Sequence, residues 1–600
     1  MSATATSAYE WKRLPWSRFE RQVFTLQKRI YRASHCGEEK TVHRLQRLLM
    51  SSWAAKCLAV RRVSQDNRGK KTAGVDGVKD LSPPQRLALA RSLSSAGRPR
   101  PVRRVWIPKP GKAERRPLGI PTLRDRAAQT LVRLALEPEW EARFEPNSYG
   151  FRPGRSCHDA IEAVYIGLTQ KAKYVLDADI AACFDRIDHT ALLDKLGTFP
   201  RLRRVISGWL QAGLLDGAEL FPTPRGTPQG GALSPLLANV ALHGPETAIR
   251  HAFPRYKPGT TNKEWRPLVI RYADDFVVLH EDLAAVERAQ QVAATWLRGM
   301  GLDLKPSKTR ITHTLHPHDG HVGFDFLGFT VRQFPVGKTH TGTNGAGQLL
   351  GFKTLIQPSL AAQKRHLHDL AEVIRRHRQS PQPLLITQLN GKIGGWANYY
   401  SAVVAKQVFN RLDHLVYRKL KRWAERRHPT KSHGWLAKHY WRQQGQRSWV
   451  FKPPGGTALA QHVRTPIRRH VKVAGTRSPY DGDWAYWARR LGRHPDLARN
   501  KAQLLRRQRG RCGWCGLVFT QMETLIEHDH TVPRALGGAE GATNRQLLHR
   551  HCHHAKTAQD GSLRPSRRGY PCQGPKITRA SRARNTVEEP DEGKLSRPVL

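Results

Sequence analysis

The sequence is short of acidic residues, of cysteine and of long apolar runs. Its 600 residues include 48 Asp and Glu and only 8 Cys. So few cysteines exclude a disulfide framework, and no stretch is long and apolar enough to span a bilayer. The opening segment MSATATSAYEWKRLPWSRFE also lacks the apolar core of a secretory signal. We therefore expect a soluble protein that is not secreted, located in the cytoplasm of a bacterium or in an organelle of a eukaryote.

The shortage of acidic residues leaves the chain strongly basic. It has 101 Lys and Arg, and its formal net charge is +53. A chain of this charge repels itself unless a polyanion lies nearby, and the basic excess runs through nearly every segment. We expect nucleic acid to be the partner, with binding that weakens steeply as salt increases. A basic surface without a specific partner is the alternative interpretation.

Local patterns divide the chain into several units, because this length exceeds what one hydrophobic core supports. Up to about residue 75, apolar residues recur at helical spacing with basic residues between them. Residues 102–121 and 268–280 each predict a pair of strands, and residues 124–144 predict a helix. From about 354 to 450 the pattern predicts strongly basic helices.

Two adjacent carboxylates, Asp274 and Asp275, lie at the tip of the apolar hairpin LVIRYADDFVVLH (268–280). Like charges this close repel each other, and a divalent cation would remove the repulsion. Asp179 ends another apolar strand, YVLDADI. If the two strands are neighbours, three carboxylates meet, and such ligands suit Mg²⁺, which completes its shell with substrate phosphates. Taken alone, Asp residues in a turn are also ordinary.

Seven segments occur in the order and at the spacing found in the reverse transcriptases encoded by group II introns, which this chain resembles. They are RPLGIPTLRDRAAQ, NSYGFRPGRSCHDAI, DADIAACFDRIDH, GTPQGGALSPLLANV, RYADDFVV, LDLKPSKT and FLGF. The resemblance implies an α+β fold of the right-hand polymerase type, with fingers and palm. An α-helical thumb or maturase domain and a small zinc-stapled ββα (HNH) domain would follow.

The same resemblance implies a division of the chain into six regions. They are an N-terminal helical extension of the reverse transcriptase (1–90), its fingers and palm (91–345), the thumb or maturase domain (346–450), a DNA-binding region (451–505), the HNH endonuclease (506–560) and a basic, disordered tail (561–600).

Within the motifs, the resemblance assigns roles to single residues. Asp179, Asp274 and Asp275 would bind two Mg²⁺ ions, and Phe184 would pack under the incoming sugar and exclude a 2′-hydroxyl. A core aromatic is the alternative for Phe184. The other nucleotide- and template-binding candidates are Lys109 and Arg116, which would clamp the triphosphate unless they form a solvated basic turn, Gln229 and Gly230, which would contact the template and the new base pair, and Lys308.

A compact group of Cys and His residues lies near the C-terminus. Cys512 and Cys515 form C-x2-C, and His549 precedes Cys552 at the same spacing. Thiolates and imidazole in such pairs are typical of a tetrahedral structural Zn²⁺ site. Other histidines of the same stretch compete with His549 for the fourth ligand position.

Between the halves of this group, Asp529-His530, Asn544 and His553 resemble the HNH nuclease motif, in which a ββα unit holds one divalent ion. The resemblance implies that His530 is the general base that activates water and that Asn544 orients it. Asp529 and His553 would hold the catalytic metal ion. A zinc knuckle with bystander histidines is the alternative.

Two basic segments carry interleaved aromatic residues. Residues 386–400 resemble the maturase domain of the family, and residues 452–490 resemble its DNA-binding region. The aromatic side chains could stack on bases or form small apolar cores, and for the first segment packing is favoured. They are Trp396, Tyr399, Tyr400, Tyr480, Trp484, Tyr486 and Trp487.

Taken as a whole, the resemblance implies the mobility of a group II intron. The protein would bind the intron RNA, assist its splicing and reverse splicing, nick double-stranded target DNA, and extend the nicked strand from dNTPs by copying the RNA. The implied cofactors are two Mg²⁺ at the polymerase site, one at the nuclease site and a structural Zn²⁺. Two alternatives remain, a non-catalytic splicing factor and a defence or retron-type reverse transcriptase with a fused nuclease. Intact carboxylates argue against the first, and residues 386–400 against the second.

Overall fold

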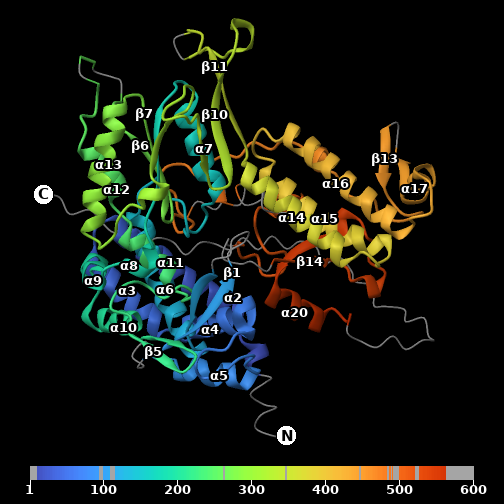
Figure 1. Ribbon diagram of the computed structural model, residues 1–600. Coiled ribbons are helices and arrows are strands. Elements are labelled where there is room, and N and C mark those ends of the chain that lie inside the picture. The colour runs from blue at the N-terminus through green and yellow to red at the C-terminus, as the bar shows by residue number, and fades with distance from the viewer. Residues whose placement is uncertain are drawn as a thin grey trace, which may run out of the picture.

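The computed structural model describes most of the chain (Figure 1). The described residues are 10–93, 99–108, 115–257, 259–260, 264–344, 347–444, 447–482, 486–487, 490, 499–519 and 526–562. Lys109, Trp484 and nearly all of the predicted disordered tail lie outside them. In the described part, no helix combines the length and apolarity that a membrane span requires.

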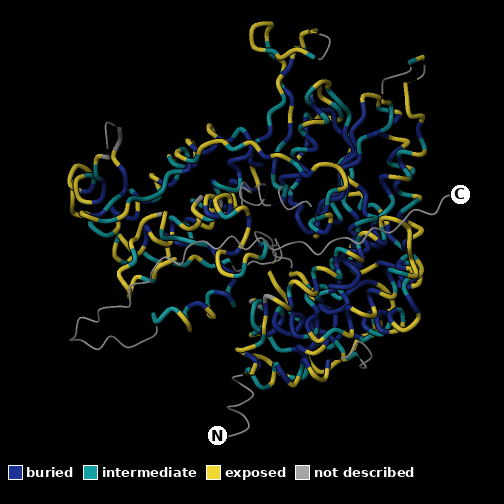
Figure 2. Tube along the Cα trace, turned by 180° about the vertical axis from the view of Figure 1, so that it is seen from behind, coloured by how far each residue is buried: buried dark blue, intermediate teal, exposed yellow. Residues whose placement is uncertain are grey.

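The N-terminal region is helical, as its spacing predicts. Its elements are α2 (Trp16–His35), α3 (Glu39–Ser51), α4 (Trp53–Arg61), the π-helical turn Arg62–Asp66 and α5 (Pro83–Ser92). All but α5, which packs on α4, pack around α6 (Leu123–Arg143), which is buried over most of its length. The hydroxyl of Thr122 caps α6 by accepting from the Asp125 amide at 3.1 Å, so the helix begins where the sequence predicts. Figure 2 shows that buried residues gather here and in the neighbouring palm.

Two four-stranded sheets form the fingers and the palm. The fingers sheet has the order β2-β1-β4-β5, and the palm sheet has the order β6-β7-β3-β8. The strands are β1 (Val102–Pro108), β2 (Arg115–Ile120), β3 (Tyr174–Asp179), β4 (Leu214–Asp216), β5 (Glu219–Phe221), β6 (Leu268–Tyr272), β7 (Asp275–His280) and β8 (Arg310–His313). The two predicted strand pairs, in residues 102–121 and 268–280, are both present.

The palm sheet is apolar on both faces because helices cover both. Val175 and Val277 belong to the core that includes α7 (Cys157–Leu168), whereas Leu176 and Val278 belong to the core that includes α13 (Leu283–Arg298). This double burial explains why the strands appear as continuous apolar runs rather than as alternating patterns. Shorter helices complete the palm: α8 (Cys183–Arg186), α9 (His189–Leu196), α10 (Pro200–Leu210), α11 (Ser234–Ala241) and α12 (Pro245–His251).

The region predicted to be helical from 354 to 450 is helical only in its middle. A three-stranded sheet of β9 (Phe324–Phe326), β10 (Phe329–Pro335) and β11 (Phe352–Pro358) precedes the helices. The helices are α14 (Leu360–Arg376), α15 (Gln382–Tyr400), α16 (Lys406–Arg427) and α17 (His433–Tyr440). A hairpin of β12 (Trp441–Gln444) and β13 (Arg447–Phe451) ends the region. The helical prediction is wrong there because Trp441 and Phe451, paired across the strands, bury their rings together 5.2 Å apart.

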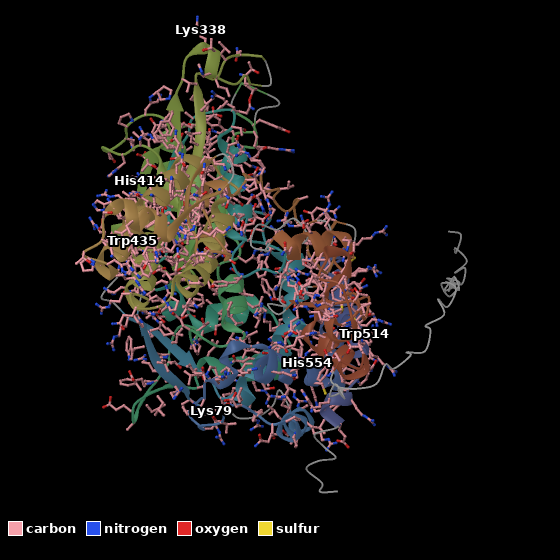
Figure 3. The ribbon with its side chains drawn as sticks, turned by 90° about the vertical axis from the view of Figure 1, so that its right-hand side faces the viewer. Lys79, Lys338, His414, Trp435, Trp514 and His554 are labelled. Atoms are coloured by element: carbon pink, nitrogen blue, oxygen red, sulfur yellow. The ribbon has the colours of Figure 1, made fainter. Side chains whose placement is uncertain are left out.

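The C-terminal unit is the small ββα fold that the resemblance implies. It contains α19 (Arg499–Arg507), the antiparallel strands β14 (Ile526–His530) and β15 (Arg545–His549), and α20 (Arg550–Gln559). Its apolar core is small, with Leu504, Leu505, Phe519, Leu547 and Leu548 beside two cysteines. Figure 3 separates this unit, marked by Trp514 and His554, from the thumb, marked by His414 and Trp435.

Candidate functional site

Sheet register brings the three predicted polymerase carboxylates together. Asp179 ends β3 directly opposite Asp275, the first residue of β7, and Asp274 occupies the turn before it. Burial, followed by the charges of Asp274 and Asp179, raises the pKa of Asp275 to about 7. Burial and the charge of Asp179 also raise the pKa of Asp274. The structure therefore holds acidic oxygens closer than their charges favour, which is the environment a divalent cation would stabilise.

A buried arginine that the sequence reasoning missed supports the acidic turn. Arg271 donates to the carbonyl of Ala273 at 3.1 Å and to the hydroxyl of Ser148 at 2.7 Å. Its pKa is lowered to about 10 by burial. Ala273 has φ +57°, a left-handed conformation that costs a non-glycine residue energy. An arginine inside the otherwise apolar strand LVIRY was the available signal, since a charge in a buried strand needs partners.

The proposed sugar and template contacts lie on neighbouring turns. Phe184 in α8 packs edge-on against Phe151, with ring centroids 6.1 Å apart. The Gln229 carbonyl accepts from the Gly119 amide of β2 at 2.6 Å, and the Gln229 side chain bonds to Asp185. Gly230 has φ +124°, and a Cβ there would lie 2.6 Å from the Gly119 carbonyl, so the turn requires glycine.

Among the predicted basic contacts, the structure places Lys308 directly on the acidic site. Its Nζ lies 2.5 Å from Oδ2 of Asp179, and this hydrogen bond raises the pKa of Lys308. Arg116 is exposed on β2, and its charge acts on Asp274. Lys109 lies outside the described residues. Lys308 and Arg116 thus approach the carboxylates from two different segments.

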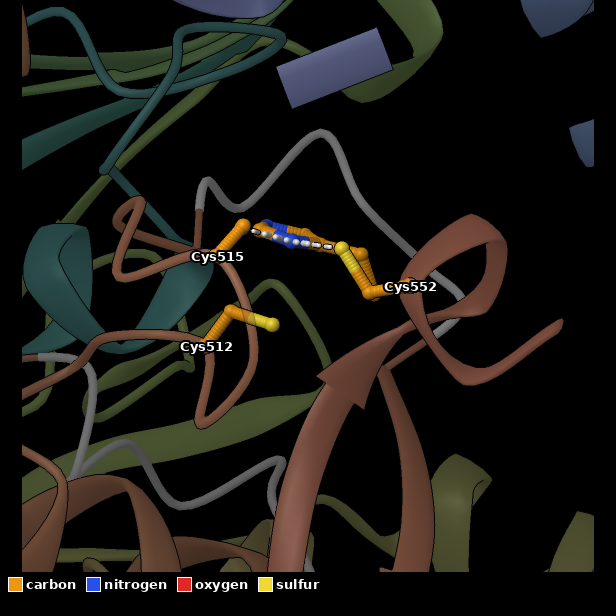
Figure 4. Close-up of side chains that lie close together, drawn as sticks. Cys512, Cys515 and Cys552 are labelled. Atoms are coloured by element: carbon orange, nitrogen blue, oxygen red, sulfur yellow. Dashed lines mark hydrogen bonds between the residues drawn. The ribbon is translucent and has the colours of Figure 1, made fainter. Parts of the chain in front are cut away.

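The four predicted zinc ligands converge in the C-terminal unit. One ligand atom from each of Cys512, Cys515, His549 and Cys552 lies within 4.8 Å of the others. Nδ1 of His549 is 3.4 Å from the Cys515 sulfur and 3.7 Å from the Cys552 sulfur. Figure 4 shows the cysteines converging from the C-x2-C turn and from α20. Three sulfurs and one imidazole nitrogen in a buried site fit a structural Zn²⁺ ion.

The predicted nuclease ligands meet across the ββα unit. Nε2 of His553 on α20 lies 3.6 Å from Oδ1 of Asp529 on β14. Two further residues that the sequence reasoning missed join them, since Glu527 Oε2 lies 2.8 Å from His553 Nδ1 and Lys556 Nζ lies 3.1 Å from Asp529 Oδ2. For Glu527, strand alternation was the available signal, because Glu527 and Asp529 are two apart on β14 and share a face.

Asn544 fixes the loop that follows the predicted general base. Its Oδ1 accepts from the Val532 amide at 2.9 Å, and its Nδ2 donates to the carbonyls of Val532 at 3.0 Å and Ala539 at 2.8 Å. His530 is half-buried at the end of β14. In the described part of the chain, His530 makes no hydrogen bond to Asp529 or His553, so the structure joins these two to each other but not to His530.

Several aromatic residues of the two basic segments are packing residues. Trp396 stacks on His366 with centroids 4.6 Å apart, and the Tyr400 hydroxyl donates to the carbonyl of Gly328. Tyr480 is buried and donates to Oε2 of Glu137 at 3.0 Å, and Trp487 is also buried. For Tyr400, Tyr480 and Trp487, burial leaves no ring face for a base, and Trp484 lies outside the described residues.

Four known families match separate parts of the chain. The family "Reverse transcriptase (RNA-dependent DNA polymerase)" matches residues 107–331, and the "N-terminal domain of reverse transcriptase" matches residues 11–93. The "Group II intron, maturase-specific domain" matches residues 363–441, and "HNH endonuclease" matches residues 512–559.

Three curated proteins are similar over long stretches. "Protein YkfC" of Escherichia coli (strain K12) is 34% identical over 324 residues, which is 48% of this chain and 82% of that protein. "Group II intron-encoded protein LtrA" of Lactococcus lactis subsp. cremoris is 28% identical over 424 residues, 58% of this chain and 69% of that protein. "Maturase-like protein 1" of Euglena gracilis is 28% identical over 246 residues, 38% of this chain and 51% of that protein. The chain belongs to the group II intron-encoded proteins, as a reverse transcriptase that also carries a maturase domain and an HNH endonuclease.

Proposed function

We propose that Asp179, Asp274 and Asp275 form the polymerase centre of this protein and hold two Mg²⁺ ions. The observation that carries this assignment is the register of β3 and β7, which sets Asp179 opposite Asp275. Bound Mg²⁺ would supply activation of a primer 3′-hydroxyl and stabilisation of the leaving pyrophosphate. The raised pKa values of Asp274 and Asp275 support this proposal, because a cation between the carboxylates would stabilise their charged forms.

The surrounding side chains position the substrates. Phe184 lies under the deoxyribose of the incoming dNTP, where its ring leaves no room for a 2′-hydroxyl. Arg116, with Lys109, binds the triphosphate, since a guanidinium offers a planar fork of donors. Gln229 and Gly230 contact the template and the new base pair, and Lys308, which donates to Asp179, contacts the nucleotide or template.

We propose that the nuclease centre uses a separate set of residues. His530 acts as the general base that takes a proton from the attacking water, and Asn544 holds the loop that orients it. Asp529 and His553 bind one divalent ion, which supplies stabilisation of the charge that develops on the phosphate. The contact between Asp529 and His553 supports this ligand pair. Cys512, Cys515, His549 and Cys552 hold the structural Zn²⁺.

The thumb or maturase domain and the region after it bind nucleic acid. We assign residues 1–90 to the helical extension, 91–345 to fingers and palm, 346–450 to the thumb or maturase domain, 451–505 to a DNA-binding region, 506–560 to the nuclease and 561–600 to a basic tail. Exposed basic side chains of α14 and α16 support binding of folded intron RNA through its phosphates. The partners are then intron RNA, double-stranded target DNA and dNTPs, in a bacterial cytoplasm or an organelle.

One preparation tests the whole assignment. The protein is co-purified with its intron RNA, and primer extension, nicking of target DNA and splicing are measured on the same sample. Asp274→Ala should lower primer extension by on the order of 10²–10³-fold and leave nicking intact. His530→Ala should lower nicking by roughly 10²–10⁴-fold and leave primer extension intact. Wild-type primer extension by Asp274→Ala, or wild-type nicking by His530→Ala, would remove the corresponding assignment.

A further inference from the structure

The nuclease unit packs against the first long helix of the polymerase. Nε2 of His551 in α20 lies 3.7 Å from Oε2 of Glu20 in α2. One ligand atom from each of Glu20, His549 and His551 lies within 4.8 Å of the others. The contact borders a cavity of about 570 Å³ whose walls include Gly230 of the template turn and Phe519 of the nuclease. The polymerase and the nuclease unit are therefore in contact at Glu20.

Glu20 is held so that one carboxylate oxygen faces the nuclease. Arg61 binds its other oxygen, with Arg61 Nη2 2.6 Å from Glu20 Oε1. Asp66 in turn binds Arg61 Nε at 3.1 Å, and the guanidinium carbon of Arg61 lies 4.8 Å from the Trp16 ring centroid. This chain of contacts within the polymerase fixes the direction of the Glu20 side chain before the nuclease is considered.

The two ring nitrogens of His549 have different surroundings. Its Nδ1 faces the thiols of Cys515 and Cys552, and its other ring nitrogen, Nε2, is buried. A histidine that binds a metal through one nitrogen usually donates its other N–H to a carboxylate, carbonyl or water, which fixes the tautomer and the ring orientation. A ligand atom of Glu20 lies within 4.8 Å of one of His549, and this carboxylate comes from the polymerase rather than from the nuclease.

We propose that Glu20 is the positioning carboxylate of the zinc-binding His549, so that a residue of the polymerase completes the zinc site of the nuclease. This inference rests on the zinc site proposed above. It makes the docking of the nuclease on α2 and the retention of zinc one linked event. A nuclease released from α2 would lose the carboxylate and hold its zinc less tightly.

An alternative role for these side chains leads to a different expected zinc content. Glu20, His549 and His551 could themselves bind a metal ion, with His549 shared between two ions. Under that arrangement the purified chain would carry two zinc ions, and removal of the Glu20 carboxylate would leave one. Under our proposal the chain carries one zinc ion with or without the carboxylate.

The test compares zinc retention in full-length Glu20→Gln and Glu38→Gln. Glu38 is an exposed carboxylate of the same helical region, so its variant is the matched control. Zinc content is measured by mass spectrometry, and zinc release is followed with a chromogenic chelator. We expect one zinc per chain in all three proteins and release from Glu20→Gln about tenfold faster than from wild type or the control. Backbone amides of 550–559 should also exchange hydrogen faster in Glu20→Gln alone.

Different outcomes would refute the role of Glu20 and the proposed zinc site. Wild-type protein without zinc would refute the zinc site itself. Zinc release and amide exchange in Glu20→Gln at wild-type rates would overturn the role of Glu20, and two zinc ions in wild type with one in the variant would replace it by a second metal site. Primer extension checks that the variant is folded. If Glu20→Gln fails that check, Glu20→Asp, which keeps the charge for Arg61 but shortens the side chain, takes its place in the same assays.

Discussion

The proposed polymerase and nuclease centres both bring acidic side chains together, but the amount of protein that supports them is very different. The polymerase carboxylates come from strands separated in the sequence, and a large apolar core shared by α6, α13 and the palm sheet fixes their register. The nuclease residues come from one short hairpin and one helix over a core of a few leucines and a phenylalanine. Small units bury too little apolar surface to be stable alone, so we expect the second site to depend on a bound metal ion where the first depends on packing.

Loss of the zinc site should have the largest effect, and it should affect the nuclease but not the polymerase. Cys552→Ser removes a buried sulfur from the ligand group, and because zinc binding contributes directly to the folding of such units, nicking should fall to background. Primer extension should stay within about twofold, since the polymerase core does not include this site. Zinc content, nicking of a target duplex and primer extension are measured together.

The matched control for this loss is Cys36→Ser. Cys36 is an exposed free thiol in the N-terminal region, so its replacement should change neither activity. If Cys552→Ser nicked DNA at the wild-type rate, the small apolar core would have to be sufficient without metal, and the contrast between the two sites would disappear.

The polymerase site should also be sensitive at Arg271, which is not one of the proposed metal ligands. Arg271→Lys keeps a positive charge under the acidic turn but loses the planar fork that bonds Ser148 and the Ala273 carbonyl. A misplaced turn should lower primer extension by on the order of 10²-fold, with nicking unchanged. Single-turnover primer extension measures the effect. Arg298→Lys, at an exposed arginine in the last turn of α13, is the control and should be active.

The sequence could predict the parts of both sites that depend on local pattern. Apolar strands ending in Asp179 and flanking Asp274 were recognisable, as were the paired cysteines of the zinc site. The residues that depend on contacts between distant segments were not. Glu20 and His549 are far apart in the sequence and lie close together only in the folded chain. Glu527 contacts His553, which lies on a helix that follows a loop. The hairpin of β12 and β13 was also missed, because its basic residues hid the pairing of Trp441 with Phe451.

The acidic turn of the polymerase should cost stability when no cation is bound. Burial and neighbouring carboxylates raise the pKa of Asp275 to about 7, so its charged form is disfavoured in the folded state. Asp275→Asn should therefore raise the melting temperature of the Mg²⁺-free protein by about 2–4 °C at pH 8, for roughly 1 kcal/mol of relieved repulsion. It should also abolish primer extension. Calorimetry with and without Mg²⁺ checks the shift, and an unchanged or lower melting temperature would contradict the repulsion argument.

The thumb supplies a smaller effect that belongs to neither metal site. His366 in α14 is buried under Trp396, and its Nε2 lies 2.8 Å from Nε2 of His462, which bonds to Asp413. Burial, and then the charges of His462 and Lys392, lower the pKa of His366 to about 3. An unfolded chain gains a proton at this histidine below about pH 6.5, whereas the folded thumb does not until much lower pH.

Because the unfolded state binds more protons in this range, the thumb should lose stability as pH falls from about 6.5 toward 3, with the loss absent above 6.5. His366→Gln keeps a hydrogen-bonding group beside His462 but cannot titrate, so it should flatten the fall in melting temperature between pH 7.5 and 5.5 by about 1–3 °C. His368→Gln, at an exposed histidine of the same helix, should leave the slope unchanged. Equal slopes in wild type and His366→Gln would show that the acid sensitivity arises elsewhere. The metal sites would then account for it, because their ligands must be deprotonated to bind metal.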